Sequence, residues 1–99
     1  MELGRVAGQV VSTIKAPSFS GLKLLLVEAV DPASGSPTAQ TPYVAVDLVG
    51  AGVGEVVLVA RGSAARTNPG TANVPTDAAV VAIVDTVVVE GSMTFSKSA

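Results

Sequence analysis

Valine is the most frequent residue of this chain, and it occurs in short runs that glycine, proline and serine interrupt. β-Branched side chains favour the pleated strand over the helix. The longest apolar run, residues 78–84, is far shorter than the about 20 residues that a membrane-spanning helix needs. The sequence therefore predicts an all-β protein that does not enter a membrane.

Five strands are predicted from the apolar runs and from the turn residues between them. The first alternates apolar with polar residues and contains Gly4 and Gly8, which predict a bulge or a sharp bend. The second is apolar at both odd and even positions, which predicts cover on two sides. The strands are Leu3 to Ile14, Leu22 to Val30, Tyr43 to Leu48, Glu55 to Ala60 and Ala79 to Glu90, the last of them broken only by Asp85 and Thr86.

The connections between these strands favour a small barrel. Residues 15–21 and 31–42 are rich in loop-forming residues, and residues 62–75 lack strand character. Within the last of these, Ser63 to Arg66 is predicted to form one helical turn with Ser63 as its N-cap. The arrangement fits a five-stranded OB-like β-barrel with a short helical insert between strands 4 and 5, and a sandwich is the alternative. Residues 1–90 form the single barrel domain, and 91–99 form a polar C-terminal tail that frays or packs on a neighbour.

The balance of apolar and charged residues predicts self-association. Hydrophobic residues make up 48% of the 99 residues and charged residues only 14%, against roughly 25% charged in a typical soluble domain. A chain this short buries a modest fraction of its surface, so copies of it are expected to cover one another in a closed homo-oligomer. An arginine at Val57 or Val81 is expected to prevent folding or assembly, because a covered apolar strand has no partner for a charge.

Catalysis and metal binding are not expected. The chain has neither cysteine nor histidine, and its eight carboxylates show no ligand pattern, so the sequence predicts no catalytic residue, no cofactor and no metal site. Asp47 and Asp85 are flanked by valines. They are expected to pair with the backbone or with Arg61 or Arg66.

The segment Gly50-Ala51-Gly52-Val53-Gly54 superficially resembles a phosphate-binding loop. Such a loop uses the amides at the start of a helix, whereas a strand follows here, so a turn with glycines at positive φ is expected. OB-like barrels often bind single-stranded nucleic acid through basic grooves and aromatic platforms. A net charge of −2 and only three aromatic residues weaken that alternative function, a nucleic-acid or small-ligand binding module. An accessory domain of an enzyme is a third possibility.

Five ordered motifs, spread over residues 1–90, together resemble the EutN/CcmL family of shell vertex proteins of carboxysomes and metabolosomes. Ala64 and Ala82 depart from the family pattern at positions where serine and glycine are common. The motifs are Gly8 to Lys15, Gly21 to Val27, Val46 to Glu55, Gly62 to Arg66 and Asp77 to Asp85.

The resemblance implies a bacterial cytoplasmic protein without enzymatic activity. It implies a homopentamer at the vertices of a microcompartment shell whose facets are built from hexameric shell proteins, and no nucleic-acid partner. The enclosed pathway does not follow from any residue. By analogy with the family, six residues are expected near the subunit interface or the five-fold axis. They are Gly50, Ala51, Gly52, Gly54, Ser63 and Arg66.

Overall fold

The computed structural model describes residues 1–97. Within that range the chain forms β-strands and two short 3-10 helices, and none of its helices has the length and apolar content needed to span a bilayer. The elements in chain order are β1 (Glu2–Val10), η1 (Pro17–Phe19), β2 (Lys23–Ala29), β3 (Tyr43–Asp47), β4 (Val56–Arg61), η2 (Gly62–Arg66), β5 (Ala78–Ile83), β6 (Thr86–Val89) and β7 (Ser92–Ser96).

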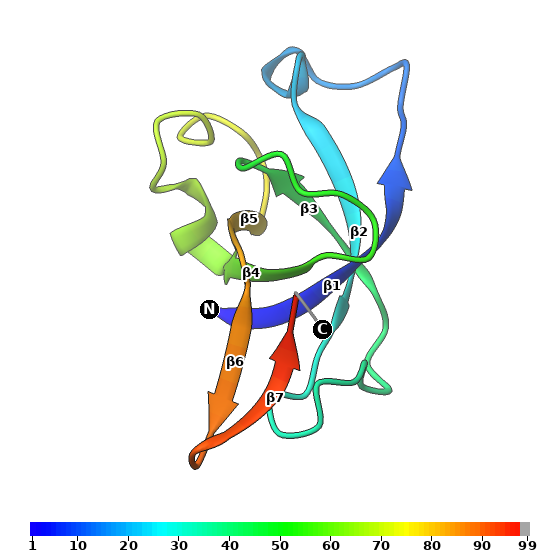
Figure 1. Ribbon diagram of the computed structural model, residues 1–99. Helices are drawn as coiled ribbons and strands as arrows, with labels where there is room; N and C mark the ends of the chain where they lie inside the picture. The colour runs from blue at the N-terminus through cyan, green and yellow to red at the C-terminus, as the bar shows by residue number, and fades with distance from the viewer. Residues whose placement is uncertain (98–99) are drawn as a thin grey trace.

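Five of the strands close into a barrel in the order β1-β2-β3-β5-β4 (Figure 1). Neighbouring strands are antiparallel except β3 and β5, which run parallel. The long β1 pairs with β4 through its first half and with β2 along most of its length, so one strand belongs to both sides of the barrel. The predicted all-β, OB-like barrel is confirmed, with η2 as the small helical insert between β4 and β5.

The long strand β1 contains a bulge and packs closely on β2 at one of its two glycines. The β1–β2 register shifts between Val6 and Gly8, which is the predicted bulge. A Cβ atom on Gly4 would overlap Cγ1 of the buried Val27 and lie 3.3 Å from the backbone oxygen of Glu28. At Gly8 the nearest atom would be Cβ of Leu26, at 4.0 Å. Gly4 is therefore required for close packing of β1 on β2, whereas Gly8 has room for a side chain.

Gly4→Ala is expected to destabilise the fold by about 1–3 kcal/mol, because the added methyl group overpacks a fully buried valine. Gly8→Ala is the matched control and is expected to change the stability by less than about 0.5 kcal/mol. Urea unfolding followed by circular dichroism measures both. Equal stability of the two variants would show that β1 moves away from Val27 at little cost.

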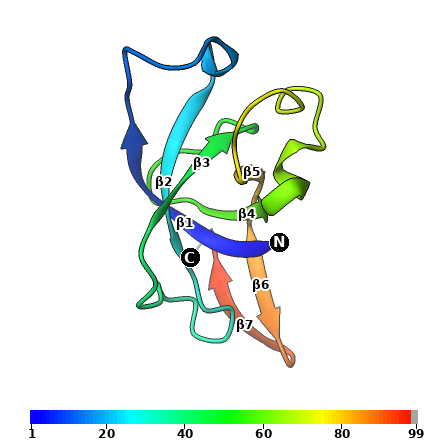
Figure 2. The ribbon, with the colours of Figure 1, turned by 180° about the vertical axis from the view of Figure 1, so that it is seen from behind.

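The first strand ends earlier than the sequence predicted. β1 stops at Val10 instead of Ile14, and the following segment closes on itself through Ser12, whose hydroxyl donates to the backbone oxygen of Ile14 at 2.7 Å. Val11 and Ile14 are 80% and 92% exposed. The alternating pattern thus continues for four residues beyond the last partner in the sheet. This loop lies at the end of the molecule opposite β6 and β7 (Figure 2).

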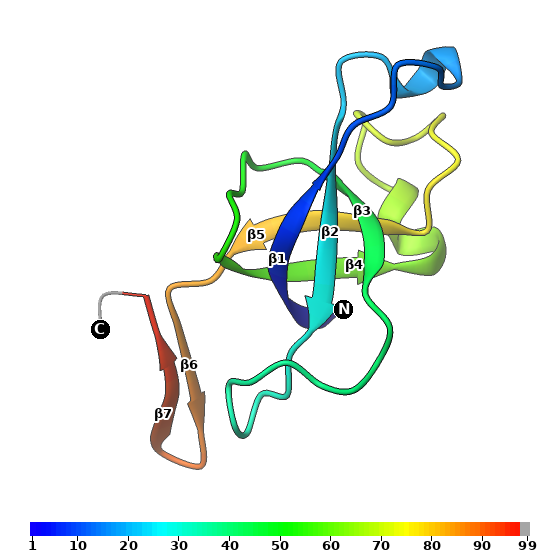
Figure 3. The same ribbon diagram turned by 90° about the vertical axis from the view of Figure 1, so that its right-hand side faces the viewer.

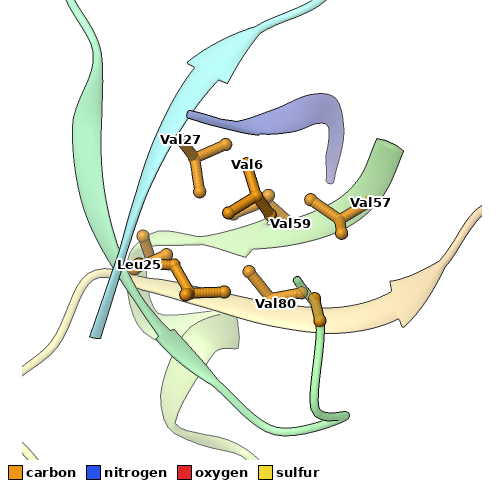
Figure 4. Packing of buried hydrophobic residues seen from close by; sticks show 9 residues of the cluster. Val6, Leu25, Val27, Val57, Val59 and Val80 are labelled. Carbon is orange, nitrogen blue, oxygen red and sulfur yellow. The ribbon is translucent and has the colours of Figure 1, made fainter. Parts of the chain in front are cut away.

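The core of the barrel is built from inward-facing side chains of all five barrel strands and from Ala51 of the loop between β3 and β4 (Figure 4). Tyr43 and Ile83 pack against its edge. Nearly all of these residues are valine or alanine, whose small volumes suit the interior of a five-stranded barrel. The buried cluster consists of Val6, Leu25, Val27, Ala45, Ala51, Val57, Val59, Ala78 and Val80.

The second strand is buried mainly on one side. Leu25 and Val27 point into the core and are at most 1% exposed, whereas Leu24 and Leu26 lie half-buried on the outside of the barrel. The two-sided cover that the sequence predicted is therefore only partial within one chain. The outer face of β2 keeps apolar surface for other contacts.

The predicted fifth strand, Ala79 to Glu90 with a break at Asp85 and Thr86, is two strands that belong to different sheets. β5 ends at Ile83, and β6 begins at Thr86 and leaves the barrel to pair with β7. The backbone amide of Val84 still donates to the carbonyl oxygen of Val56 at 2.8 Å, and β4 offers no further partner beyond that point. The chain therefore bends at residues 84 and 85.

Part of the predicted tail is a strand. Ser92–Ser96 forms β7, and the Glu90-Gly91 turn joins it to β6 with positive φ at both residues, 50° and 81°. Two consecutive residues of positive φ are typical of the turns that join two-residue hairpins. The two remaining residues of the predicted tail, 98 and 99, lie outside the described residues.

The helical turn also differs in detail from its prediction. It begins at Gly62, with Arg61 at the N-cap position and no side-chain cap, so the predicted Ser63 N-cap is wrong. Gly62 has a φ of 64°, and its amide donates to the backbone oxygen of Asp77 at 2.8 Å. A backbone contact to the segment before β5 therefore starts the turn.

Candidate functional site

The glycine loop, residues 50–54, lies between β3 and β4, and the amides of its three glycines are bonded within the protein. Oδ1 of Asp47 accepts from the amides of Val49 and Gly50 at 3.1 and 3.2 Å. Oε1 of Glu55 accepts from the amide of Gly52 at 2.7 Å, and the amide of Gly54 donates to the backbone oxygen of Val6 at 2.8 Å. The loop is therefore a turn, as the sequence predicted.

The same loop is anchored to the barrel by Ala51. The Ala51 side chain is fully buried in the core, and Nζ of Lys23 donates to its backbone oxygen at 2.8 Å. Gly50 and Gly54 have φ of 78° and 91°, whereas Gly52 has no positive φ. At the tip Val53 is 70% exposed. Only the glycines and Val53 of this loop are thus available to another molecule.

The 3-10 helix η2, which contains Ser63 and Arg66, follows the other end of β4 (Figure 1). Ser63 is exposed, and a guanidinium nitrogen of Arg66 donates to the backbone oxygen of Thr76 at 2.8 Å. Because the six-residue β4 separates Gly54 and Glu55 from η2, about 20 Å of extended chain lies between them. The structure does not bring the two predicted segments together within one chain.

The two unusual carboxylates have different surroundings. Asp47 caps the glycine loop through the backbone, as the sequence predicted. The backbone oxygen of Asp85 accepts from the amide of Lys97 at 2.7 Å. Arg61 pairs with Glu2 and Arg66 with the backbone of Thr76, so the backbone alternative of the prediction is confirmed for Asp47.

A polar cluster that the sequence did not predict joins β1, β3 and β4. Oε1 of Glu2 accepts from the hydroxyl of Tyr43 at 2.6 Å and from Arg61 at 2.7 Å. The guanidinium of Arg61 lies over the Tyr43 ring, 4.0 Å from its centroid. These residues are far apart in sequence, and no local pattern connects them. The cluster ties three strands together at one rim of the barrel.

The cluster shifts the ionisation of its members. The Tyr43 hydroxyl and then the Arg61 guanidinium hold the pKa of Glu2 below its usual value of 4.5, although partial burial opposes this. Burial raises the pKa of Tyr43, and its hydrogen bond to Glu2 raises it further. At neutral pH the carboxylate is charged and the phenol is protonated, which is the pairing that the short contacts require.

Glu2→Gln is expected to lower the stability at pH 7 by up to about 1 kcal/mol, a small value because both charged side chains are more than a third exposed. The folded pKa of Glu2 is lower than the unfolded one. This stabilisation is therefore present above about pH 4.5 and is lost as the pH falls through the folded pKa. Urea unfolding at pH 7 and pH 3 measures it. A wild-type advantage that persists at pH 3 would contradict the role of the ionised Glu2.

A second ion pair connects the glycine loop to the C-terminal hairpin. Nζ of Lys97 lies 3.0 Å from Oε2 of Glu55, whose other oxygen accepts from Gly52. The Gly52 amide and then Lys97 lower the pKa of Glu55, and Glu55 raises the pKa of Lys97. The loop and the hairpin are therefore held in a fixed relation by residues at 52, 55 and 97.

Several large apolar side chains lie on the surface of the described residues. Among residues 1–97 no group of three or more carboxylates is placed to hold a metal ion. A shallow hollow of about 430 Å³ lies beside the N-terminus and contains Leu3, Val30 and Gln40 among its lining residues. The large apolar side chains most exposed to solvent are Met1, Val11, Ile14, Val44, Val49, Val53, Val88 and Met93.

Comparison with known proteins gives the same picture over the whole chain. Residues 1–85 match the family described as "Ethanolamine utilisation protein EutN/carboxysome". The carboxysome shell vertex protein CcmL of Synechocystis is 50% identical over 97 residues, which is 98% of this chain and 95% of that protein.

Solved structures share the fold as well. The structure of CcmL from Gloeobacter violaceus superposes with a TM-score of 0.93 and 47% identity, and each chain is covered completely. The GrpN pentameric microcompartment shell protein from Rhodospirillum rubrum gives a TM-score of 0.77 and 48% identity over 90% of this chain and 98% of its own. The barrel, its sequence motifs and these full-length similarities together establish that this chain belongs to the EutN/CcmL family.

Proposed function

We propose that this protein is a structural subunit of a bacterial microcompartment shell and that five copies form a ring at each vertex. The main support is its similarity, over nearly the whole chain, to a carboxysome shell vertex protein and to a pentameric microcompartment shell protein. The proposed location is therefore the shell of a microcompartment in the bacterial cytoplasm.

The surface of the barrel supports a ring. The core is complete within one chain, yet several large apolar side chains outside it are more than half exposed, including Val53, Val88 and Met93. Exposed apolar area of this kind is typical of surfaces that contact another subunit. In a ring of five each contact joins two different surfaces of the protomer, so apolar residues are required in more than one place.

The proposed role is geometric and requires no catalytic residue. Six-fold units tile a flat layer, and five-fold units at the corners let such a layer close into a polyhedron. The proposed partners are therefore hexameric shell proteins of the facets. We further propose that the exposed parts of the glycine loop (Gly50, Gly52 and Gly54) and of η2 (Ser63 and Arg66) lie near a subunit interface or the five-fold axis. The buried Ala51 side chain supports that loop from inside the barrel.

The alternative function, nucleic-acid binding on an OB-like barrel, finds little support in the surface. The formal charge of −2 does not attract a polyanion. The Tyr43 ring is stacked by Arg61 and its hydroxyl is bonded to Glu2, so this aromatic is not free to stack on a base.

The ring is tested by the mass of the purified protein in solution. Five copies of the 9.8 kDa chain give about 49 kDa, which sedimentation or native mass spectrometry distinguishes from smaller rings. A well-folded protein of monomer mass at micromolar concentration would contradict the proposal.

The vertex role is tested by co-expression with a hexameric facet protein. Closed polyhedral particles are expected when the chain is present, and open sheets or tubes are expected when it is left out. Identical assemblies in the two cases would show that the ring does not serve to close a shell.

A further inference from the structure

The β6–β7 hairpin stands apart from the barrel. It forms its own two-stranded sheet, and in Figure 3 it extends away from the other strands. The molecule measures 44 Å along its long axis and 24 Å along the other two. A two-stranded hairpin is marginally stable by itself in water, so this element depends on contacts made by its faces.

One face of the hairpin is held by the same chain. Val87 and Phe95 are opposite one another in the ladder, and both are partly buried. The Thr94 hydroxyl donates to the backbone oxygen of Pro32 at 2.7 Å. At the base, Lys97 bonds to Asp85 through its amide and to Glu55 through its ammonium group. These contacts fix the direction in which the hairpin points.

The opposite face carries an apolar pair that this chain leaves largely open. Val88 and Met93 are partners across the strands, and they are 60% and 61% exposed. Because partners in a ladder share a face, their side chains form one patch. A bulge at Thr94 separates this pair from Val87 and Phe95 and lets the two faces differ in their cover.

We propose that this outer face, Val88 and Met93, packs on the neighbouring copy of the chain in the ring. The inference rests on the proposed pentamer and names one of its contact surfaces. A second copy is the partner of choice for two reasons. The contact between subunits of a ring joins unlike surfaces, which suits an arm that projects from the barrel of its own protomer. The solved relatives titled as pentameric share this fold.

The Val11–Ile14 loop is the competing apolar surface, and it differs from the hairpin in one respect. It closes on itself, since the Ser12 hydroxyl donates to the backbone oxygen of Ile14 and the Lys15 ammonium group donates to the backbone oxygen of Ser12 at 3.0 Å. Both strands of the hairpin are edge strands, and exposed apolar edge strands tend to associate with another chain.

The test compares Met93→Glu with Ser92→Glu. Both residues are exposed in one protomer and adjacent in sequence, but they lie on opposite faces of β7. Met93→Glu is expected to weaken the ring, because it buries an unpaired charge in the contact. The protein concentration needed to keep the ring assembled is expected to rise by about 100-fold or more. Ser92→Glu is expected to leave the ring intact. Sedimentation measures the mass, and circular dichroism checks that both variants are folded.

A second measurement uses the absence of cysteine from the chain. Met93→Cys and Ser92→Cys each introduce a single thiol, and alkylation of the first is expected to be at least ten-fold slower in the assembled protein. Equal alkylation rates in a ring of confirmed mass, or an intact Met93→Glu ring, would overturn the hairpin contact alone. A wild-type protein that is monomeric would instead overturn the proposed pentamer.

Discussion

Val57→Arg is expected to abolish folding. Val57 is fully buried among Val6, Val59 and Val80 in the centre of the barrel, where none of the residues of the buried cluster is charged or polar. An arginine there has to lose its hydration without a partner or force the barrel open. The cost of about 5 kcal/mol or more is comparable with the whole stability of a small domain. Circular dichroism and solubility after expression measure the result.

Val81→Arg is the matched control, and it is expected to fold. Val81 is the extra residue of a bulge in β5, between the partners of Leu58 and Val59, and it is only half-buried on the outside of the barrel. A long arginine side chain at such a position extends into solvent. A folded Val57→Arg protein, or an unfolded Val81→Arg protein, would contradict the assignment of the two faces.

The sequence predicted equal burial for Val57 and Val81, and the structure shows why the two differ. Both valines lie in uninterrupted apolar runs. Such a run has no alternation of apolar and polar residues, so the sequence does not show which side chains face the core and which face outward. In β5 the bulge also changes the parity, so that Val80 and Ile83 both face the core although they are three positions apart. The all-β class and the OB-like barrel were therefore predictable, but the full closure of the barrel and the inward-facing set were not.

The C-terminal hairpin carried a signal that the sequence reading missed. Glu90-Gly91 lies between Val87-Val88-Val89 on one side and Met93-Thr94-Phe95 on the other, and a residue followed by glycine between two β-prone runs indicates a two-residue hairpin. The prediction instead extended one strand to Glu90 and assigned the rest to a tail. The sequence therefore did not predict that Val88 and Met93 are an apolar pair across two strands.

Some polar contacts of the candidate site were predictable from the sequence and others were not. Asp47 capping the glycine loop was predictable, because an aspartate accepts bonds from amides two and three residues later. The cluster of Glu2, Tyr43 and Arg61 was not, since it joins β1, β3 and β4 across distances in sequence that only the closed barrel brings together. Hydrogen bonds between residues close in sequence can be predicted from the sequence, whereas contacts across the barrel depend on the pairing register of the strands.

Leu25→Ala is expected to lower the free energy of unfolding by about 2–5 kcal/mol. Leu25 is the largest fully buried side chain of the core, and the small valines around it have little reach to fill the space that it leaves. Leu26→Ala removes the same atoms from the half-buried outer face of β2, and a loss less than half as large is expected. Urea unfolding of both variants across a range of protein concentrations measures the difference.

The concentration dependence decides what covers the outer face of β2. Equal losses for Leu25→Ala and Leu26→Ala at every concentration would contradict the burial within a single barrel. Equal losses only where the ring is assembled would mean that a neighbouring copy covers Leu26, because association stabilises by mass action. That outcome would explain why β2 is apolar at both odd and even positions although its own barrel fully buries only one of its faces.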